Sequence, residues 1–133
     1  MPYVNIRISM HESSEVAEKI VSIVMRHTTE VLGKKAEVTS VTIDFVQPEV
    51  WFVGGSRVSE MSAVTFYLDI KVTKGTNTKG EKAEYVRGIF SDFESILGPI
   101  TPASYIVIHE IGADSWGFQG KTQEYRFIQD QSL

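Results

Sequence analysis

An internal repeat limits the folds open to this 133-residue chain more than any other feature of its sequence. Three pairs of landmark residues are each separated by 65 positions: Gly33 and Gly98, Val41 and Ile106, and Trp51 and Trp116. Self-similarity at a fixed separation indicates that one structural unit is written twice. We therefore expect two similar units, residues 1–61 and 62–133, that share one core in a single domain.

Each unit is predicted to run strand, helix, strand. In the first unit, apolar and polar residues alternate over residues 4–8, which is typical of a half-buried strand close to the N-terminus. Ser13 or Ser14 can cap a helix whose apolar stripe ends at Gly33. The second strand of this unit is expected at residues 41–45.

The second unit repeats this order. Alternation over residues 66–70 predicts its first strand, and residues 106–109 predict its last. Between them, Thr78 and Glu81 have the spacing of a capping box at the start of a helix. The first strands of the two units align at an offset of 62, which places three extra residues in the loop at 74–77, where an insertion is tolerated.

The order of elements predicts the fold class. A helix of this length can cross the sheet and return the chain parallel to its first strand, normally with right-handed connectivity. Two such units predict an α+β fold, in which two consecutive βαβ units form a four-stranded sheet with two helices on one face. A ferredoxin-like sandwich has the same order of elements and hosts many unrelated functions, so the fold class alone does not indicate a function.

The composition excludes several classes of function. Thirteen Lys and Arg against 17 Asp and Glu give a net charge of −4, so neither nucleic acid nor a membrane is an expected partner. The chain has no cysteine, which excludes disulfides and thiolate chemistry and fits a cytoplasmic location. No apolar run approaches the roughly 20 residues of a membrane span, and no signal peptide is predicted. The three histidines share no ligand spacing, so no metal is expected.

The first residues bear directly on function, because a predicted strand starts immediately behind Met1 and Pro2. Removal of Met1, which is common before a small residue, would leave Pro2 with a free secondary amine at the start of this strand. Apolar surroundings lower the pKa of such an amine, so it could act as a general base near neutral pH. Proline is also structurally harmless at the first position of a strand, and this alternative stays open.

Several segments together resemble the tautomerase superfamily: residues 2–8, 32–34, 39–43, 51–55, 105–111 and 114–117. Members of this 4-oxalocrotonate tautomerase-like superfamily are built from βαβ units and use an amino-terminal proline as catalytic base or acid. The doubled length is similar to the fused two-unit branches of cis-3-chloroacrylic acid dehalogenase and macrophage migration inhibitory factor. The resemblance implies a homotrimer with Pro2 as the catalytic residue. Val64, the counterpart of Pro2 at the offset of 62, cannot be a second amine base, so one site per chain is expected.

The residues expected to bind an anionic substrate depart from the family pattern. The family usually supplies arginines, whereas the matching positions here fall near His11 and Glu12 and on Thr42. The resemblance instead implies Lys71 and Lys74, at the positions of two arginines in the dehalogenase branch, and Lys34, which matches a substrate-facing lysine in the cytokine-like branch. A lysine offers a point charge without the bidentate fork of arginine. The structural alternatives are a solvated surface and, for Lys34, a cation stabilised by the helix dipole.

Aromatic and polar residues complete the predicted site. Tyr105 matches a tyrosine near the proline in the cytokine-like branch, and it could donate a hydrogen bond or simply pack on the sheet. Trp51 and Trp116 could form pocket walls and subunit contacts, or a hydrophobic clasp between the units. Glu110 could orient a water and His109 stands beside it, although strand alternation puts the two on opposite faces of the sheet.

Together these features predict a cofactor-independent tautomerase or isomerase, in which Pro2 moves a proton on a small anionic 2-oxo acid or its enol. One alternative is a proline-dependent hydratase, dehalogenase or decarboxylase of the same superfamily. Another is a non-enzymatic trimeric binding module that has kept the scaffold without the chemistry. The sequence does not choose among these reactions, and it leaves the substrate and the pathway open.

Overall fold

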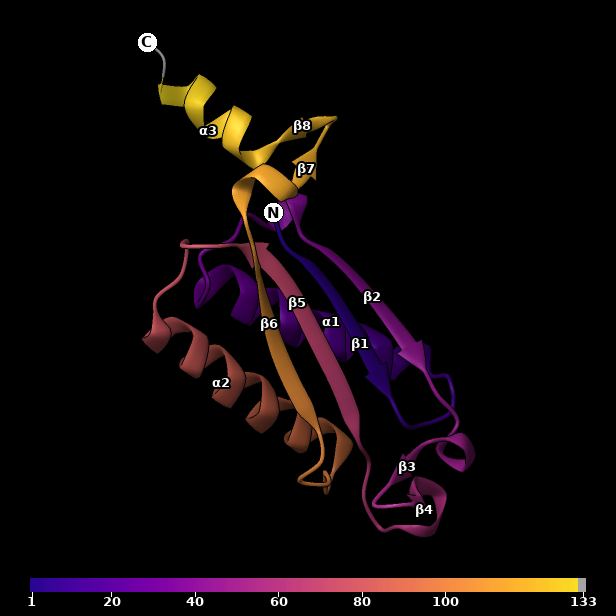
Figure 1. The fold of residues 1–133 in the computed structure, drawn as a ribbon. Coiled ribbons are helices and arrows are strands. Elements are labelled where there is room, and N and C mark those ends of the chain that lie inside the picture. Colours follow the sequence, from indigo (N-terminus) through magenta and orange to yellow (C-terminus); the bar gives the residue numbers. More distant parts are fainter. Residues whose placement is uncertain (132–133) are drawn as a thin grey trace.

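The structure, a computed structural model, describes residues 1–131 and contains both predicted units. The first unit consists of β1 (Tyr3–Ile8), α1 (Ser14–Glu30) and β2 (Ser40–Phe45), and the second of β5 (Phe66–Thr73), α2 (Lys79–Leu97) and β6 (Tyr105–Ile111). These four strands form one sheet in the order β2-β1-β5-β6, parallel within each unit and antiparallel between the units. Both long helices lie on one face of this sheet (Figure 1), which confirms the predicted fold class.

The core lies between the sheet and the two helices. Ile20 and Val24 of α1, and Ile89 and Phe93 of α2, are completely buried against the sheet. Because side chains alternate along a strand, the polar residues between the buried ones point to the other face, which no helix covers. The strand residues that point into the core are Val4, Ile6, Ile8, Phe66, Leu68, Ile70 and Val72.

The helix ends follow the capping signals in the sequence. The Ser13 hydroxyl accepts a hydrogen bond at 3.2 Å from a backbone N–H in the first turn of α1. The capping box before α2 is complete, because the Thr78 hydroxyl accepts from the Glu81 N–H at 3.1 Å and the Glu81 carboxylate accepts from the Thr78 N–H at 2.8 Å. After both helices the chain turns at a glycine with positive φ, +68° at Gly33 and +82° at Gly98. These conformations favour glycine because it lacks a Cβ.

The strand register corrects the predicted alignment of the two units. Tyr3 pairs with Ser40 in the first unit, and Tyr67 pairs with Tyr105 in the second. When Ser40 of β2 is aligned with Tyr105 of β6, as the internal repeat requires, Tyr3 is aligned with Tyr67. The first strands therefore have an offset of 64 and not of 62. The residues that cap the two helices, Ser13 and Thr78, have the same offset of 65 as β2 and β6. Because the first strands have an offset of 64, the loop between β5 and α2 holds one extra residue and not three.

The counterpart of Pro2 in the second unit is consequently Phe66 and not Val64. Phe66 is fully buried in the core, so the expectation that the second unit has no amine base is unchanged. The apolar alternation could not separate the two alignments. Both offsets are even, and an even shift keeps every side chain on the same face of the sheet.

Each unit ends in a small hairpin, and both hairpins follow a tryptophan. β3 (Phe52–Val53) pairs with β4 (Ser56–Arg57), and β7 (Gly117–Phe118) pairs with β8 (Lys121–Thr122). The C-terminal helix α3 (Gln123–Gln131) projects beyond the second hairpin, at one end of the sheet (Figure 1).

In the described part of the chain, no helix combines the length and the apolar character needed to cross a membrane. Short 3₁₀ turns occupy Ala36–Val38, Pro48–Val50, Val58–Glu60 and Ala113–Ser115.

The two long helices contact each other through a polar cluster around His27. The His27 ring lies over Gly88, where a Cβ atom would come within 2.5 Å of the imidazole, and its Nε2 is 2.6 Å from a carboxylate oxygen of Asp92. The ring also packs edge-on against Tyr85, whose hydroxyl is 3.0 Å from the Thr28 hydroxyl. Burial raises the pKa of Tyr85 to about 12. His27 is thus partnered within the helix interface.

Candidate functional site

The N-terminal residues are packed against both units at the end of the sheet where β1 begins. Pro2 is buried, and its carbonyl oxygen accepts a hydrogen bond from the Ser40 N–H at 3.2 Å. Trp116 donates its indole N–H to the Met1 carbonyl oxygen at 2.9 Å, and the amide nitrogen of Gln123 lies 3.3 Å from the Met1 sulfur. The peptide that joins Met1 to Pro2 is therefore held between β2 and the second hairpin.

The surroundings of this chain end disfavour a charged amine. Burial lowers the pKa of the Met1 amine below its usual value, and the positive charges of Lys34 and Lys35 lower it further. Lys34 is half-buried, whereas Lys35 is exposed. An α-amine with a lowered pKa is more often unprotonated at neutral pH and can accept a proton. Of the three predicted lysines, Lys34 is the one whose charge acts on the amine at the chain terminus.

Contacts from both units fix Lys34. Its backbone N–H donates to the Thr28 carbonyl oxygen at 3.1 Å, at the end of α1. Its Nζ donates to the Thr76 hydroxyl at 2.8 Å, in the loop that follows β5. Burial lowers the pKa of Lys34, while the negative charge of Glu81 acts in the opposite direction. The result is a partly desolvated ammonium close to the N-terminal amine, which can attract an anionic group.

Lys71 and Lys74 do not join this cluster within one chain. Lys71 pairs with Tyr3 in the strand register, and its Nζ lies 3.0 Å from a carboxylate oxygen of Asp69. Lys74 is exposed behind the end of β5, where its charge helps to lower the pKa of Glu110. Neither lysine is among the charges that lower the pKa of the N-terminal amine.

His109 and Glu110 lie on opposite faces of β6, as the alternation predicts. The Glu110 carboxylate accepts a hydrogen bond from Lys82 Nζ of α2 at 2.7 Å, on the face covered by the helices. That hydrogen bond is the main cause that lowers the pKa of Glu110. His109 pairs in register with Lys71, which contacts Asp69 on the uncovered face. The carboxylate of Glu110 is therefore engaged in an ion pair with α2.

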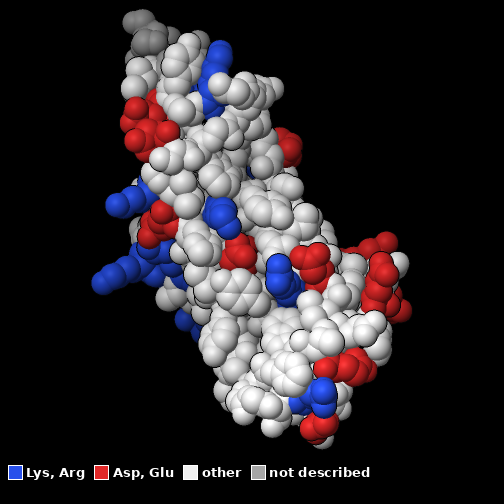
Figure 2. Space-filling model, turned by 45° about the vertical axis from the view of Figure 1, so that its right-hand side comes forward, with Lys and Arg blue, Asp and Glu red and all other residues white. Residues whose placement is uncertain are grey.

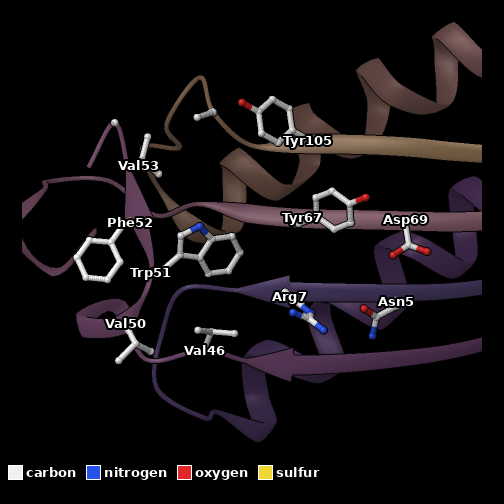
Figure 3. Close-up of a pocket in the computed structure, with 12 residues that line it drawn as sticks. Asn5, Arg7, Val46, Val50, Trp51, Phe52, Val53, Tyr67, Asp69 and Tyr105 are labelled. Atoms are coloured by element: carbon white, nitrogen blue, oxygen red, sulfur yellow. The ribbon is translucent and has the colours of Figure 1, made fainter. Parts of the chain in front are cut away.

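A pocket of about 780 Å³ opens on the uncovered face of the sheet, at the end remote from Pro2. Trp51 and Phe52 of the first hairpin border it on one side, and Tyr105 stands on its rim at the start of β6 (Figure 3). Polar side chains of β1 and β5 line its floor: Asn5, Arg7, Tyr67 and Asp69.

Sequence reasoning missed these four floor residues, although the signal was present. Asn5 and Arg7 alternate with buried core residues, so they must point to the face opposite the core. The amide of Asn5 donates to the Thr42 hydroxyl at 2.8 Å, and the Arg7 guanidinium lies 4.0 Å from the Asp44 carboxylate. Figure 2 shows basic and acidic side chains on the side that it views, with uncharged surface between them.

The predicted site residues thus fall into two groups at opposite ends of β1. Pro2, Lys34 and Trp116 lie at the start of the strand, whereas Trp51 and Tyr105 border the pocket toward its other end. Through Tyr67, Tyr105 is level with Arg7, five positions after Pro2, so the two groups are about 17 Å apart along the strand at roughly 3.3 Å per residue. One chain by itself therefore does not bring all five residues into a single site. Across the described residues, no three acidic or histidine side chains gather into a group that could hold a metal ion.

Comparison with known proteins adds a sequence match and several structural ones. Residues 67–125 match the model of the family described as "Tautomerase enzyme", which covers most of the second unit. No curated protein matches the chain in sequence.

Solved structures match the chain over nearly its whole length. An asymmetric trimer of a wild-type fused 4-OT, R7, has a TM-score of 0.81 and 16% identity, and the match covers 94% of this chain and 98% of that one. Pt0534, solved after inactivation by 2-oxo-3-pentynoate, has a TM-score of 0.82 and 10% identity, with 93% and 98% covered. A macrophage migration inhibitory factor-like protein from Entamoeba histolytica has a TM-score of 0.73 and 21% identity, with 91% and 97% covered. At these identities, the matches show that the fold is shared.

Proposed function

We propose that this chain is a two-unit member of the tautomerase superfamily and acts as a cofactor-independent tautomerase, because residues 67–125 match the model of that family and the whole chain shares the fold of fused 4-OT. The N-terminal amine of Pro2, freed by removal of Met1, is the general base. The substrate is a small anionic 2-oxo acid or its enol, and the reaction moves a proton between carbon and oxygen, which makes the enzyme an isomerase.

One observation carries this proposal: the start of the chain is buried beside a partly desolvated lysine. Burial and the charge of Lys34 lower the pKa of an α-amine at this position. The nitrogen of Pro2 lies one residue further into the structure than the Met1 amine, about 3.8 Å along the chain, so the same causes act on it once Met1 is removed. An uncharged amine held in this place can take a proton from carbon at neutral pH.

The neighbouring residues have complementary roles in the proposed reaction. The ammonium of Lys34 attracts the substrate carboxylate or the oxygen on which negative charge develops as the enol forms, and a fixed positive charge lowers that barrier. The protonated Pro2 amine then returns its proton to the other position of the same substrate. Trp116, whose indole N–H reaches the Met1 carbonyl oxygen, borders the space that removal of Met1 would open beside the Pro2 nitrogen, and there it forms a wall of the site. Lys71 remains the second candidate for the carboxylate, because it lies opposite Tyr3 at the same end of the sheet.

We further propose that three copies assemble, because one chain separates its predicted site residues. The sheet face that carries the pocket is uncovered, and Tyr105, at 57% exposure, stands on that pocket's rim. In a trimer, Trp51 and Tyr105 of one copy would complete the Pro2 end of the next. Relatives with the same fold have been solved as trimers.

Native mass measurement tests the assembly. We expect a species of three times the 14.9 kDa of one chain that persists on dilution to low micromolar concentration. Light scattering after size-exclusion chromatography provides the measurement. A monomer that retains full enzymatic activity would contradict the shared site, since every active site would then be complete within one chain.

Reaction with 2-oxo-3-pentynoate tests the amine itself. This electrophilic 2-oxo acid inactivates a protein of the same fold, and here we expect one adduct per chain on the Pro2 nitrogen. The rate of labelling should rise with pH through the lowered pKa of the amine, so labelling stays fast below the ordinary value near 8. Peptide mapping distinguishes the terminal amine from the lysines. Adducts distributed over the surface lysines, formed only at higher pH, would contradict the proposal.

The contacts of Met1 favour a second candidate function. The carbonyl and sulfur of Met1 are both held in the structure, by Trp116 and Gln123. If these contacts reflect a retained methionine, the Pro2 nitrogen is an ordinary amide and the chain is a non-enzymatic binding module. The intact mass of the labelled protein distinguishes the tautomerase from the binding module. The tautomerase requires a mass that shows both the loss of Met1 and the addition of one label.

A further inference from the structure

The loop between β5 and α2 reaches across to the first unit and holds the end of α1. Asn77 donates its amide N–H to the Leu32 carbonyl oxygen at 2.9 Å. Its neighbour Thr76 contacts Lys34, as described above. This is the loop in which the second unit carries its one extra residue, and the counterpart of Lys34 after the second helix is Pro99, which has no ammonium to hold. The symmetry between the units is therefore broken at the loop that touches the candidate site.

The hydroxyl of Thr76 has a defined direction. It lies 2.6 Å from the Thr73 carbonyl oxygen and donates its only proton there. Its lone pairs are then free to accept from the ammonium of Lys34 at 2.8 Å. A hydroxyl that already donates to a carbonyl is a better acceptor, because hydrogen bonds in a chain polarise one another. Lys34 thus has a fixed acceptor, anchored in turn to the backbone at the end of β5.

We propose that Thr76 is a positioning residue that holds the ammonium of Lys34 beside the N-terminal amine. This inference rests on the proposed function for its effect on catalysis, but its effect on Lys34 is independent of any activity. Lysine has a flexible four-carbon stem, so without an acceptor its ammonium spreads over many positions. The negative charge of Glu81 also attracts this ammonium.

The physical consequence has a definite sign. A positive charge close to the amine lowers the pKa of the amine, so a Lys34 ammonium that moves away lets this pKa rise toward its ordinary value. The substrate carboxylate loses a fixed partner at the same time. Removal of the Thr76 hydroxyl should therefore shift the activity profile to higher pH and weaken substrate binding, while the reacting amine itself stays in place.

Three variants test this role: Thr76→Val, Thr76→Ser and Thr29→Val. Thr76→Val keeps the shape and removes the acceptor, whereas Thr76→Ser keeps the hydroxyl. Thr29→Val is the matched control, because among the described residues the Thr29 hydroxyl donates to carbonyl oxygens within α1 and makes no contact with Lys34. For Thr76→Val we expect KM to rise at least about threefold, with kcat changed less, and the rising limb of the pH profile to move to higher pH. Thr76→Ser and Thr29→Val should match the wild type.

A measurement without substrate separates this inference from the proposed function. Side-chain NMR of Lys34, labelled at Nζ, should show an ordered ammonium in the wild type and in Thr76→Ser, and a mobile one in Thr76→Val. Equal order in all variants would overturn the role of Thr76, whatever the activity. If the wild type shows no turnover but Thr76→Val still makes the Lys34 ammonium mobile, the role of Thr76 is upheld. Only the tautomerase proposal is then refuted.

Discussion

A Pro2→Ala protein should keep its fold and lose about 100-fold or more of its turnover of an enol substrate such as phenylenolpyruvate. General base catalysis typically contributes this much or more, and alanine leaves a primary amine that is less restricted than the proline ring. The fold should survive because the one backbone hydrogen bond at this residue uses the Pro2 carbonyl, which alanine retains. Steady-state turnover, with circular dichroism of the same samples, measures both effects.

The matched control is Pro102→Ala, at an exposed proline in the loop before β6. That variant should turn over substrate as fast as the wild type. If the wild type is active and Pro2→Ala is equally active, the base assignment is wrong. If Pro102→Ala loses activity as well, the loss reflects a general disturbance of the fold and says nothing about the amine.

Phe66→Ala should destabilise the protein by about 3–5 kcal/mol, which is a large part of the stability of a domain of this size. Phe66 has no exposed area and packs against Phe93 and Phe90, with ring centroids 4.9 and 6.0 Å away. Its truncation removes apolar contacts and leaves a cavity at the centre of the second unit. Urea unfolding at one fixed protein concentration measures the change, since assembly makes the apparent stability depend on concentration.

Phe52→Ala is the control for this effect, because the Phe52 ring, at the start of the first hairpin, is 53% exposed. We expect its free energy of unfolding to change by no more than about 0.5 kcal/mol for a dissociated chain. A small effect of Phe66→Ala, close to that of Phe52→Ala, would show that Phe66 does not occupy the core.

Features that depend on neighbouring residues could be predicted from the sequence. The hydroxyl of Ser13, the capping box of Thr78 and Glu81 and the glycines after both helices act over a few residues, so their positions specify where helices start and end. The period of two along β1 likewise predicts which side chains enter the core. The internal repeat then places the second unit once the first is understood.

The candidate site could be predicted only in part from the sequence. Pro2 followed from its place in front of a predicted strand, and Lys34 from a resemblance that could not rank it above Lys71 and Lys74. All three lysines are polar residues near the ends of elements, and local patterns treat them alike. The contact that distinguishes Lys34 comes from Thr76, which is 42 residues away in the chain.

The sequence by itself determined the two βαβ units, the ends of their helices and the presence of a proline in front of the first strand, because these follow from periods and caps that act within a few residues. Only the tertiary structure decided the register of β5, the lysine that lies beside the N-terminal amine, and the separation of Trp51 and Tyr105 from Pro2. The physical reason is that pairing between strands, burial of charge and contacts across units depend on residues far apart in the chain, and no periodicity records which of them meet.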